Sequence, residues 1–161
     1  MDFKKLIDDK TVCEIRSDND LQTFDVGVIF HTNAHSIFVI CFGKDGAFSK
    51  YAMIPIDFIC SVSYGTEYIK NLNIPDVSID ENMNFSEWEC IQDVFEFLKN
   101  NSSVVAFYDY DETELARGII EDYDDDSATV HIIDDESGDF DGTMILTTSQ
   151  YFTLEWTNKS N

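Results

Sequence analysis

Two stretches of equal length decide the fold of this 161-residue chain. The first is FDVGVIFHTNAHSIFVICF, residues 24–42, and the second is LARGIIEDYDDDSATVHII, residues 115–133. Each stretch has a glycine, Gly27 or Gly118, inside a run of strand-forming residues, then a polar loop, then a second run rich in β-branched or aromatic residues. This pattern predicts two strands joined by a short loop in each stretch.

The similarity extends outward, so that residues 12–64 align with residues 104–156 at an offset of 92, which slips to 91 around the first hairpin. Each copy has five strand-like segments separated by polar or glycine-containing turns. Glycine weakens the middle of a strand, so we interpret Gly27 and Gly118 as bends that let a long strand curve around a small barrel. Five short strands at this spacing predict a closed or nearly closed barrel, and two copies predict two barrels.

One helix is predicted between the two copies. Ser86 and Glu89 have the spacing of a capping box, in which each side chain bonds the backbone of the other residue. Apolar residues then recur on one helix face at Trp88, Ile91, Val94, Phe95 and Leu98. We expect this face to pack in the core and to hold the two barrels together, and the alternative is that it fills the groove of a partner. A short helical turn is also expected around residues 3–7.

These segments predict a mainly β fold class, with two five-stranded barrels joined by one amphipathic α-helix. Residues 1–72 would form the first barrel with its short N-terminal helical turn. Residues 73–101 would form the linker and the helix, and residues 102–161 the second barrel.

The four cysteines, Cys13, Cys41, Cys60 and Cys90, have neither C-x-x-C spacing nor a histidine at the spacing of a zinc site. Cys13, Cys41 and Cys60 lie in apolar, strand-like segments, where a free thiol behaves as a small hydrophobic residue. We therefore expect buried, reduced thiols and no disulfide.

The short N-terminal helical turn, the five bent strands and the glycine in the second strand resemble the Sm-like, SH3-type small barrel over nearly all of each copy. Sm proteins bind RNA through an Asp and an Asn in the loop after the second strand and an Arg-Gly pair between the fourth and fifth strands. Here the first loop, residues 32–36, matches only at Asn33, and the Arg117-Gly118 pair lies in a different strand. The acidic loop of the second copy, residues 122–126, would repel phosphate. The resemblance therefore implies the fold and not RNA binding.

Acidic residues dominate the charge of the chain, with 32 Asp and Glu against 10 Lys and Arg and a net charge of −22. A content of 43% hydrophobic and 14% aromatic residues favours a folded chain over a disordered acidic tail. Residues 1–70 carry a net charge of −3 and residues 71–161 carry −19. Because a polyanion gains nothing from counterion release, nucleic acids and anionic membranes are disfavoured as partners, most firmly for the second half.

With no long apolar run and no signal-peptide pattern, we expect a cytoplasmic protein without membrane binding.

Motifs for catalysis and metal binding give no candidate. The three histidines, His31, His35 and His131, have no Ser, Cys or Glu partner at a recognisable spacing, and no phosphate loop, nucleophile elbow or zinc motif occurs. If Gly142 is placed at position 6 of an EF-hand loop, Thr148 stands where the bidentate Glu is required. We therefore predict no enzyme, no catalytic, cofactor-binding or metal-binding residue and no cofactor. Weak binding of a divalent cation at Asp134 to Asp141 stays open.

The acidic second copy is the candidate binding surface. Aromatic residues such as Phe107 and Phe140 would supply the anchors of an interface. The candidate partner-binding residues are Asp109, Tyr110, Asp111, Glu112, Glu114, Asp122, Tyr123, Asp124, Asp125 and Asp126. Our leading hypothesis is a non-enzymatic cytosolic protein that binds a basic protein partner, and an immunity or inhibitor protein directed at a basic nuclease-type toxin fits it. The alternatives are acidity that serves solubility alone, a DNA-mimic inhibitor, a degenerate Sm-like RNA-binding module or a structural protein, and the oligomeric state is open.

Overall fold

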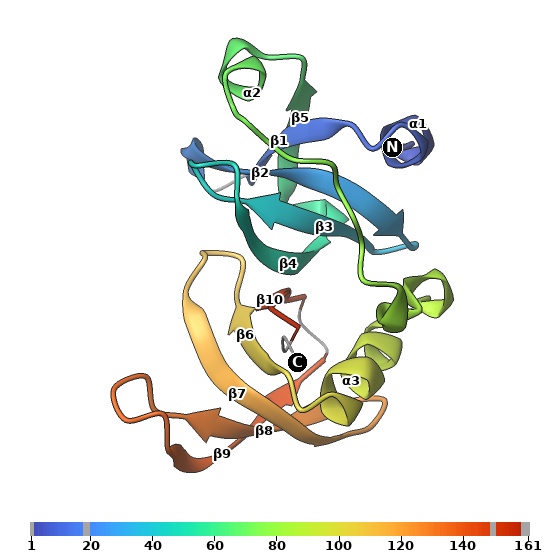
Figure 1. Ribbon diagram of the computed structural model, residues 1–161. Coiled ribbons are helices and arrows are strands. Elements are labelled where there is room, and N and C mark those ends of the chain that lie inside the picture. The colour runs from blue at the N-terminus through green and yellow to red at the C-terminus, as the bar shows by residue number, and fades with distance from the viewer. Residues whose placement is uncertain (1, 18–19, 149–150, 159–161) are drawn as a thin grey trace. The chain divides into compact units, whose positions relative to one another are not determined.

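The computed structural model describes residues 2–17, 20–148 and 151–158 (Figure 1). It is mainly β, with 47% strand and 19% helix, which confirms the predicted class. The chain divides into two compact units, residues 1–86 and 87–161. The segment 73–101, expected to lie between two barrels, is thus shared between the two units, and its helix belongs to the second.

The first unit has a short N-terminal helix, five strands, a second short helix and several 3-10 turns. Its helices and strands are α1 (Lys4–Asp8), β1 (Val12–Ser17), β2 (Asp20–Thr32), β3 (Ser36–Phe42), β4 (Phe48–Pro55), β5 (Ile59–Tyr64) and α2 (Glu67–Lys70). The 3-10 turns are Ile56–Phe58, Glu81–Met83 and Phe85–Glu87, the last of which ends one residue into the second unit. The expected helical turn near the N-terminus is therefore present as α1.

The second unit has one longer helix followed by five strands. They are α3 (Ile91–Asn100), β6 (Val104–Tyr108), β7 (Glu114–Tyr123), β8 (Ser127–Ile133), β9 (Phe140–Thr147) and β10 (Thr153–Trp156). Each of the ten predicted strand segments overlaps one of the ten strands of the described residues, and several of the strands extend beyond the predicted bounds.

Strand pairing follows the same order in both units, β5-β1-β2-β3-β4 in the first and β10-β6-β7-β8-β9 in the second. Neighbouring strands are antiparallel within each unit, and the register repeats at the offsets found in the sequence. The rows that contain the two glycines show the match, Cys13–Gly27–Cys41 and Val105–Gly118–Ile132. The outermost strands of a unit, β4 with β5 and β9 with β10, do not pair with each other, so the strand pairing described does not close either unit into a barrel.

Gly27 and Gly118 stand where the backbone of the neighbouring strand comes closest. A Cβ atom at Gly27 would overlap the carbonyl oxygen of Ile40, and one at Gly118 would overlap the carbonyl oxygen of His131. A register irregularity follows each glycine at the same distance, after Ile29 in β2 and after Ile120 in β7. Only glycine permits this approach, and the bulge adds a local bend to the strand.

Alternation along the strands builds the core of the first unit. On β3, Ile37, Val39 and Cys41 point into a buried cluster that also contains Ala52 and Ile54 of β4. Phe3, at the start of α1, is buried in the same cluster, and Leu6 and Ile7 of that helix pack against it. The period-two pattern of β-branched residues therefore places the core of this unit.

The core of the second unit is covered by α3, which packs on β7. Val94, Phe95 and Leu98 are fully buried, and the Phe95 ring lies 6.3 Å from that of Phe107 on β6. The predicted apolar helix face is thus a core face, although Ile91 is only partly buried.

The start of this helix differs from the prediction. Residues 85–87 form a 3-10 turn, and α3 begins at Ile91, so the expected box of Ser86 and Glu89 is wrong. Asp93 is the side chain that caps the helix, since its Oδ2 accepts hydrogen bonds from the N–H groups of Glu89 and Cys90 at 2.9 and 3.1 Å. Trp88 is buried before the helix begins, because its large apolar side chain packs against Phe97 and Trp156.

The cysteines divide into two pairs, and none of the four is in a disulfide. Cys13 and Cys41 are buried as predicted, and burial raises the pKa of the Cys13 thiol to about 11. Cys60 and Cys90 are exposed, so the expected burial of Cys60 is wrong. Cys60 follows the buried Ile59 on β5, and alternation turns its side chain to the other face of the strand.

Among the described residues, no helix is long and apolar enough to cross a membrane.

Candidate functional site

The ten candidate binding residues do not form one cluster. They fall on the two turns that flank β7, a strand of ten residues and therefore about 30 Å long at 3.2 to 3.4 Å per residue. Five of them lie at the start of β7, Asp109, Tyr110, Asp111, Glu112 and Glu114. The other five lie at its end, Asp122, Tyr123, Asp124, Asp125 and Asp126. We name these regions the pocket end, residues 109–117 with 132–141, and the helix end, residues 121–127 with α3.

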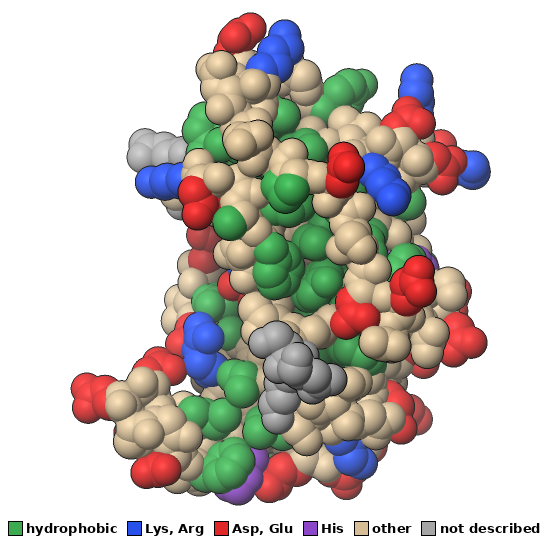
Figure 2. Space-filling view, viewed as in Figure 1, with side chains coloured by type: hydrophobic (Ala, Val, Ile, Leu, Met, Phe, Trp, Pro, Cys, Tyr) green, Lys and Arg blue, Asp and Glu red, His purple; other side chains and the backbone are tan. Residues whose placement is uncertain are grey.

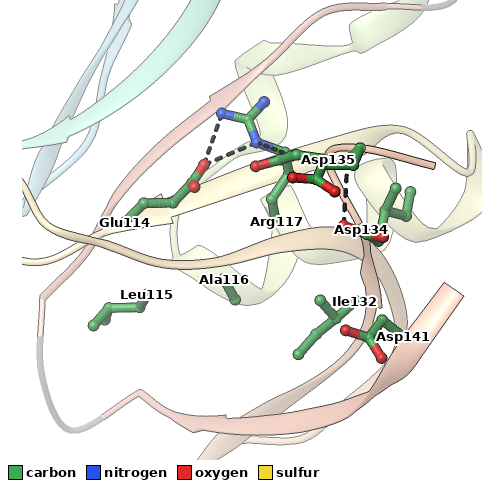
Figure 3. Close-up of a pocket in the computed structure, with 10 residues that line it drawn as sticks. Glu114, Leu115, Ala116, Arg117, Ile132, Asp134, Asp135 and Asp141 are labelled. Atoms are coloured by element: carbon green, nitrogen blue, oxygen red, sulfur yellow. Dashed lines mark hydrogen bonds and ion pairs between the residues drawn. The ribbon is translucent and has the colours of Figure 1, made fainter. Parts of the chain in front are cut away.

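The pocket end combines two hairpin turns. Because successive antiparallel strands reverse direction, the β6–β7 and β8–β9 turns lie at the same end of the sheet. Between them lies a pocket of about 430 Å³ (Figure 3). Its apolar residues are Leu115, Ala116, Ile132 and Ile133, and its charged residues are Glu114, Arg117, Asp134, Asp135, Glu136 and Asp141. Five carboxylates and one guanidinium thus surround a small apolar surface.

Among the described residues, Arg117 is the one cation that lines this pocket, and acidic neighbours hold it in place. Its guanidinium lies 2.7 Å from Glu114 Oε1 and 3.6 Å from Asp135 Oδ1, and Figure 3 shows both contacts. Partial burial works to lower the pKa of Arg117, but the hydrogen bond and charge of Glu114 outweigh it and raise that pKa. Three carboxylates of the lining, Asp134, Glu136 and Asp141, have no ion pair with Arg117.

The β6–β7 turn exposes acidic and aromatic side chains to solvent, and a hydrogen bond within the turn holds its backbone. Asp109 Oδ1 accepts a hydrogen bond from the N–H of Thr113 at 2.9 Å, which closes the turn. Asp111 and Glu112 are exposed at its tip, where Glu112 has a positive φ of 61°. Tyr110 is 45% exposed beside them. The pocket end therefore places an accessible aromatic ring next to carboxylates.

The carboxylates of the helix end are largely used within the unit. Asp124 Oδ1 accepts hydrogen bonds from the N–H groups of Asp126 and Ser127, both at 2.8 Å, and these bonds hold the pKa of Asp124 below its ordinary value. Asp122 lies 3.7 Å from Lys99 Nζ on α3. These contacts shape the β7–β8 turn and leave fewer carboxylates for a partner.

Tyr123 connects the helix end to α3. Its hydroxyl donates a hydrogen bond to Glu96, and this bond is the main reason that the pKa of Tyr123 rises to about 12. The ring also lies 6.0 Å from that of Phe95. Tyr123 is thus a structural residue of the second unit, and Tyr110 is the more accessible of the two candidate tyrosines.

Several residues of these two regions were missed by the sequence analysis. Arg117, Glu136 and Asp141 line the pocket, and Glu96 and Lys99 bind residues of the helix end. The signal for the pocket was available, since alternate hairpin turns of a meander lie at the same end of the sheet. The expected anchors also differ, because Phe107 is fully buried in the core whereas Phe140 is 54% exposed.

The remaining candidate chemistry is limited. Across residues 2–17, 20–148 and 151–158, no three His, Cys, Asp or Glu side chains are arranged to hold a metal ion. His131 lies 3.0 Å from Glu121 through Nδ1, and its ring stacks on that of Phe140 at 3.8 Å. These contacts place His131 in the outer face of the sheet.

The chain was also compared with known proteins. No protein-family model matches it, and neither a curated protein nor a solved structure does.

Proposed function

We propose that this chain is a non-enzymatic binding protein whose second unit engages a basic protein partner. The observation that carries the proposal is the charge of that unit, which has 19 acidic and 3 basic side chains, a net charge of −16. Its cations Lys99 and Arg117 already have carboxylate partners. A surface of this kind accelerates encounter with a basic protein and favours it over acidic competitors.

The pocket end is the part of this surface that a partner would contact first. Its carboxylates surround apolar side chains, so a Lys or Arg of the partner could place its aliphatic stem on Ile132 and Ile133 and its charge near Asp134 or Asp141. Tyr110 would supply an aromatic contact at the rim. An immunity or inhibitor protein that covers a basic nuclease-type partner would use such a surface.

The fold proposed for each unit is an Sm-like, SH3-type small barrel. Three features support it in the first unit: the five-strand meander whose fifth strand returns to β1, the glycine bend at Gly27, and the 3-10 turn Ile56–Phe58 between β4 and β5. The second unit repeats the meander and the glycine bend. Tandem duplication of one ancestral barrel accounts for the common register.

A test of the binding function starts from the whole chain. It would be immobilised, incubated with extract of its native host at low salt and eluted with a salt gradient. We expect a basic protein, identified by mass spectrometry, to elute as salt rises, because screening weakens the attraction between charged surfaces. Recovery of no basic protein, or capture that salt does not affect, would overturn the proposal.

Matched variants then locate the contact. Asp111→Asn with Glu136→Gln removes two charges at the pocket end, and Asp125→Asn with Asp126→Asn removes two at the helix end. We expect the pocket-end pair to weaken binding of the captured partner by about tenfold, mostly through slower association, and the helix-end pair to have a smaller effect. Equal effects would mean that only the net charge matters.

A further inference from the structure

The free edge of β9 is a second feature of the acidic unit. β9 pairs with β8, and no other strand of the described residues pairs with its remaining edge. Its last five residues, Thr-Met-Ile-Leu-Thr at 143–147, include neither charge nor proline. Natural sheets normally protect such an edge with charges, prolines or bulges, because its backbone groups can pair with another strand. Here a register irregularity disturbs only the first part of β9, before Thr143.

The side chains around this edge are apolar and accessible. Ile145 is 67% exposed and Phe140 is 54% exposed. Figure 2 shows hydrophobic side chains at the surface over the β8–β9 hairpin, with carboxylates near them. Met144 and Leu146 alternate with Ile145 and are partly buried, opposite Val130 and Ala128 of the core. The edge therefore offers backbone hydrogen bonds and an apolar contact together.

Acidic residues lie near both ends of β9. The strand begins next to the turn of residues 134–139, at the pocket end. At its other end, the N–H of Thr148 donates to the carbonyl oxygen of Asp126 at 2.8 Å, and Thr148 Oγ1 donates to that of Asp125 at 3.1 Å. A strand of eight residues therefore spans the distance between the two acidic regions.

We propose that β9 receives an extended segment of the basic partner as an added strand. This inference rests on the proposed function and specifies the partner's chemistry: a β-forming segment with Lys or Arg at both ends. Backbone hydrogen bonds to residues 143–147 would hold the segment, one face of it would contact Ile145, and its terminal cations would lie near Asp139 or Asp141 and near Asp126. A second copy of this chain is a poorer occupant, because pairing two β9 strands would bring two units of net charge −16 together.

The test uses a labelled synthetic peptide, Lys-Arg-Thr-Val-Thr-Val-Thr-Arg-Lys, and the full chain. Fluorescence anisotropy would measure affinity, and amide hydrogen exchange by NMR would locate the contact. We expect one peptide to bind per chain and to slow exchange within residues 143–147 but not within β5, which also has one unpaired edge among the described strands. A control peptide with two adjacent N-methyl groups at its centre keeps the charge and blocks both edges, so it should bind at least about tenfold more weakly.

A matched pair of protein variants separates the edge from the general charge. Ile145→Lys and Val104→Lys each add one positive charge at an exposed apolar residue of a strand, the first on β9 and the second on β6. We expect Ile145→Lys to weaken peptide binding about tenfold and Val104→Lys less than about threefold. Both side chains are exposed, so both variants should fold, which the NMR spectrum would check.

Three outcomes would overturn this inference: peptide binding without protection of residues 143–147, equal binding of the N-methylated peptide, or a dimer in sedimentation that Ile145→Lys dissociates. If one of them occurs while the host partner is still captured in a salt-dependent way, the inference fails and the proposed function stands. If the peptide adds to β9 but no basic partner is captured, the proposed function fails and β9 remains a general strand acceptor.

Discussion

In the first unit, the sheet face opposite the core carries Phe38 and Tyr51, which are 0% and 6% exposed. Rings of the same unit surround them, with Phe30 and Phe48 within 6.3 Å of one or the other. In the second unit the register places Thr129 and Thr143 at the equivalent positions. Thr129 is partly buried and Thr143 is exposed, near the exposed Ile145.

The two units thus use one backbone pattern for two kinds of surface. Glycine bends, bulges and core-facing residues recur at the same offset, whereas the opposite face changes from aromatic to polar and acidic. The net charges follow this difference, −6 for the first unit and −16 for the second. The core-facing residues therefore keep the same strand register in both units, whereas the opposite face is buried at Phe38 in the first unit and exposed at Thr143 and Ile145 in the second.

The largest difference in stability should appear when one side chain on the sheet face opposite the core is truncated in each unit. Phe38→Ala removes a fully buried ring and should cost about 3 to 5 kcal/mol of the free energy of unfolding. Thr129→Ala, at the equivalent position, should change it by less than about 0.5 kcal/mol. Amide hydrogen exchange, which reports each unit separately, would measure both. Similar losses would show that the outer face of the second unit is also packed.

The glycine bends should behave alike in both units. Gly27→Ala and Gly118→Ala each force a methyl group against a carbonyl oxygen of the adjacent strand, and we expect each to cost about 3 kcal/mol. Gly43→Ala is the control, because its nearest contact is the side chain of Asp45 at 3.2 Å, and it should cost about 0.5 kcal/mol. Urea unfolding would measure the three variants. A loss at only one of the two bends would contradict a common role.

Much of this arrangement could be predicted from the sequence. Strands recur wherever β-branched and aromatic residues are concentrated between turn residues, so the ten segments and the equivalence of Gly27 and Gly118 could be predicted. The start of α3 could not, because Asp93 caps it through backbone contacts with Glu89 and Cys90, while the Ser86 and Glu89 spacing was the stronger sequence pattern.

The candidate surface was predicted only in part. The acidic residues were identified from the sequence. Because residues 109–114 and 122–126 are close in the sequence, they were expected to share one surface. Strand β7 separates them, and the turn at residues 134–139 joins the first group instead. The free edge of β9 depends on strand order, which composition does not determine.

Removing a helix cap should lower the free energy of unfolding by different amounts in the two units, and this difference should be smaller than those above. Asp93→Ala removes an acceptor from two N–H groups at the start of α3 and should cost about 1 kcal/mol, whereas Thr66→Ala at the one-turn α2 should cost about 0.5 kcal/mol. Desolvation works to raise the pKa of Asp93, but hydrogen bonds from the N–H groups of Cys90 and Glu89 outweigh it and hold that pKa below its ordinary value.

The effect of Asp93→Ala should therefore depend on pH. A lowered carboxyl pKa stabilises the fold above the pKa of the unfolded chain, and this contribution is lost as pH falls through the pKa of the folded state. Urea unfolding at neutral pH and in acid would show the difference between wild type and Asp93→Ala shrink in acid. A difference that persists there would attribute the effect to packing of the side chain.

The smallest predicted effect is a change in the pKa of one tyrosine. Tyr51 and Tyr123 both have raised pKa values, but for different reasons. Burial is the main cause for Tyr51 in the first unit, and the hydrogen bond to Glu96 is the main cause for Tyr123 in the second, where the pKa reaches about 12. Glu96→Gln should bring the pKa of Tyr123 back toward 10 and leave that of Tyr51 unchanged. Ultraviolet titration, with Tyr123→Phe to assign the signal, would measure the shift.

Glu89→Gln removes the same charge from the same unit without touching Tyr123, so it is the matched control for Glu96→Gln. A raised phenol pKa contributes stability below the pKa of the unfolded chain, which is lost as pH rises through the folded value, so only strongly alkaline solution should reveal it. If Glu89→Gln shifted Tyr123 as much as Glu96→Gln does, the cause would be the field of the whole acidic unit. The second unit would then differ from the first in long-range electrostatics and not in one local bond.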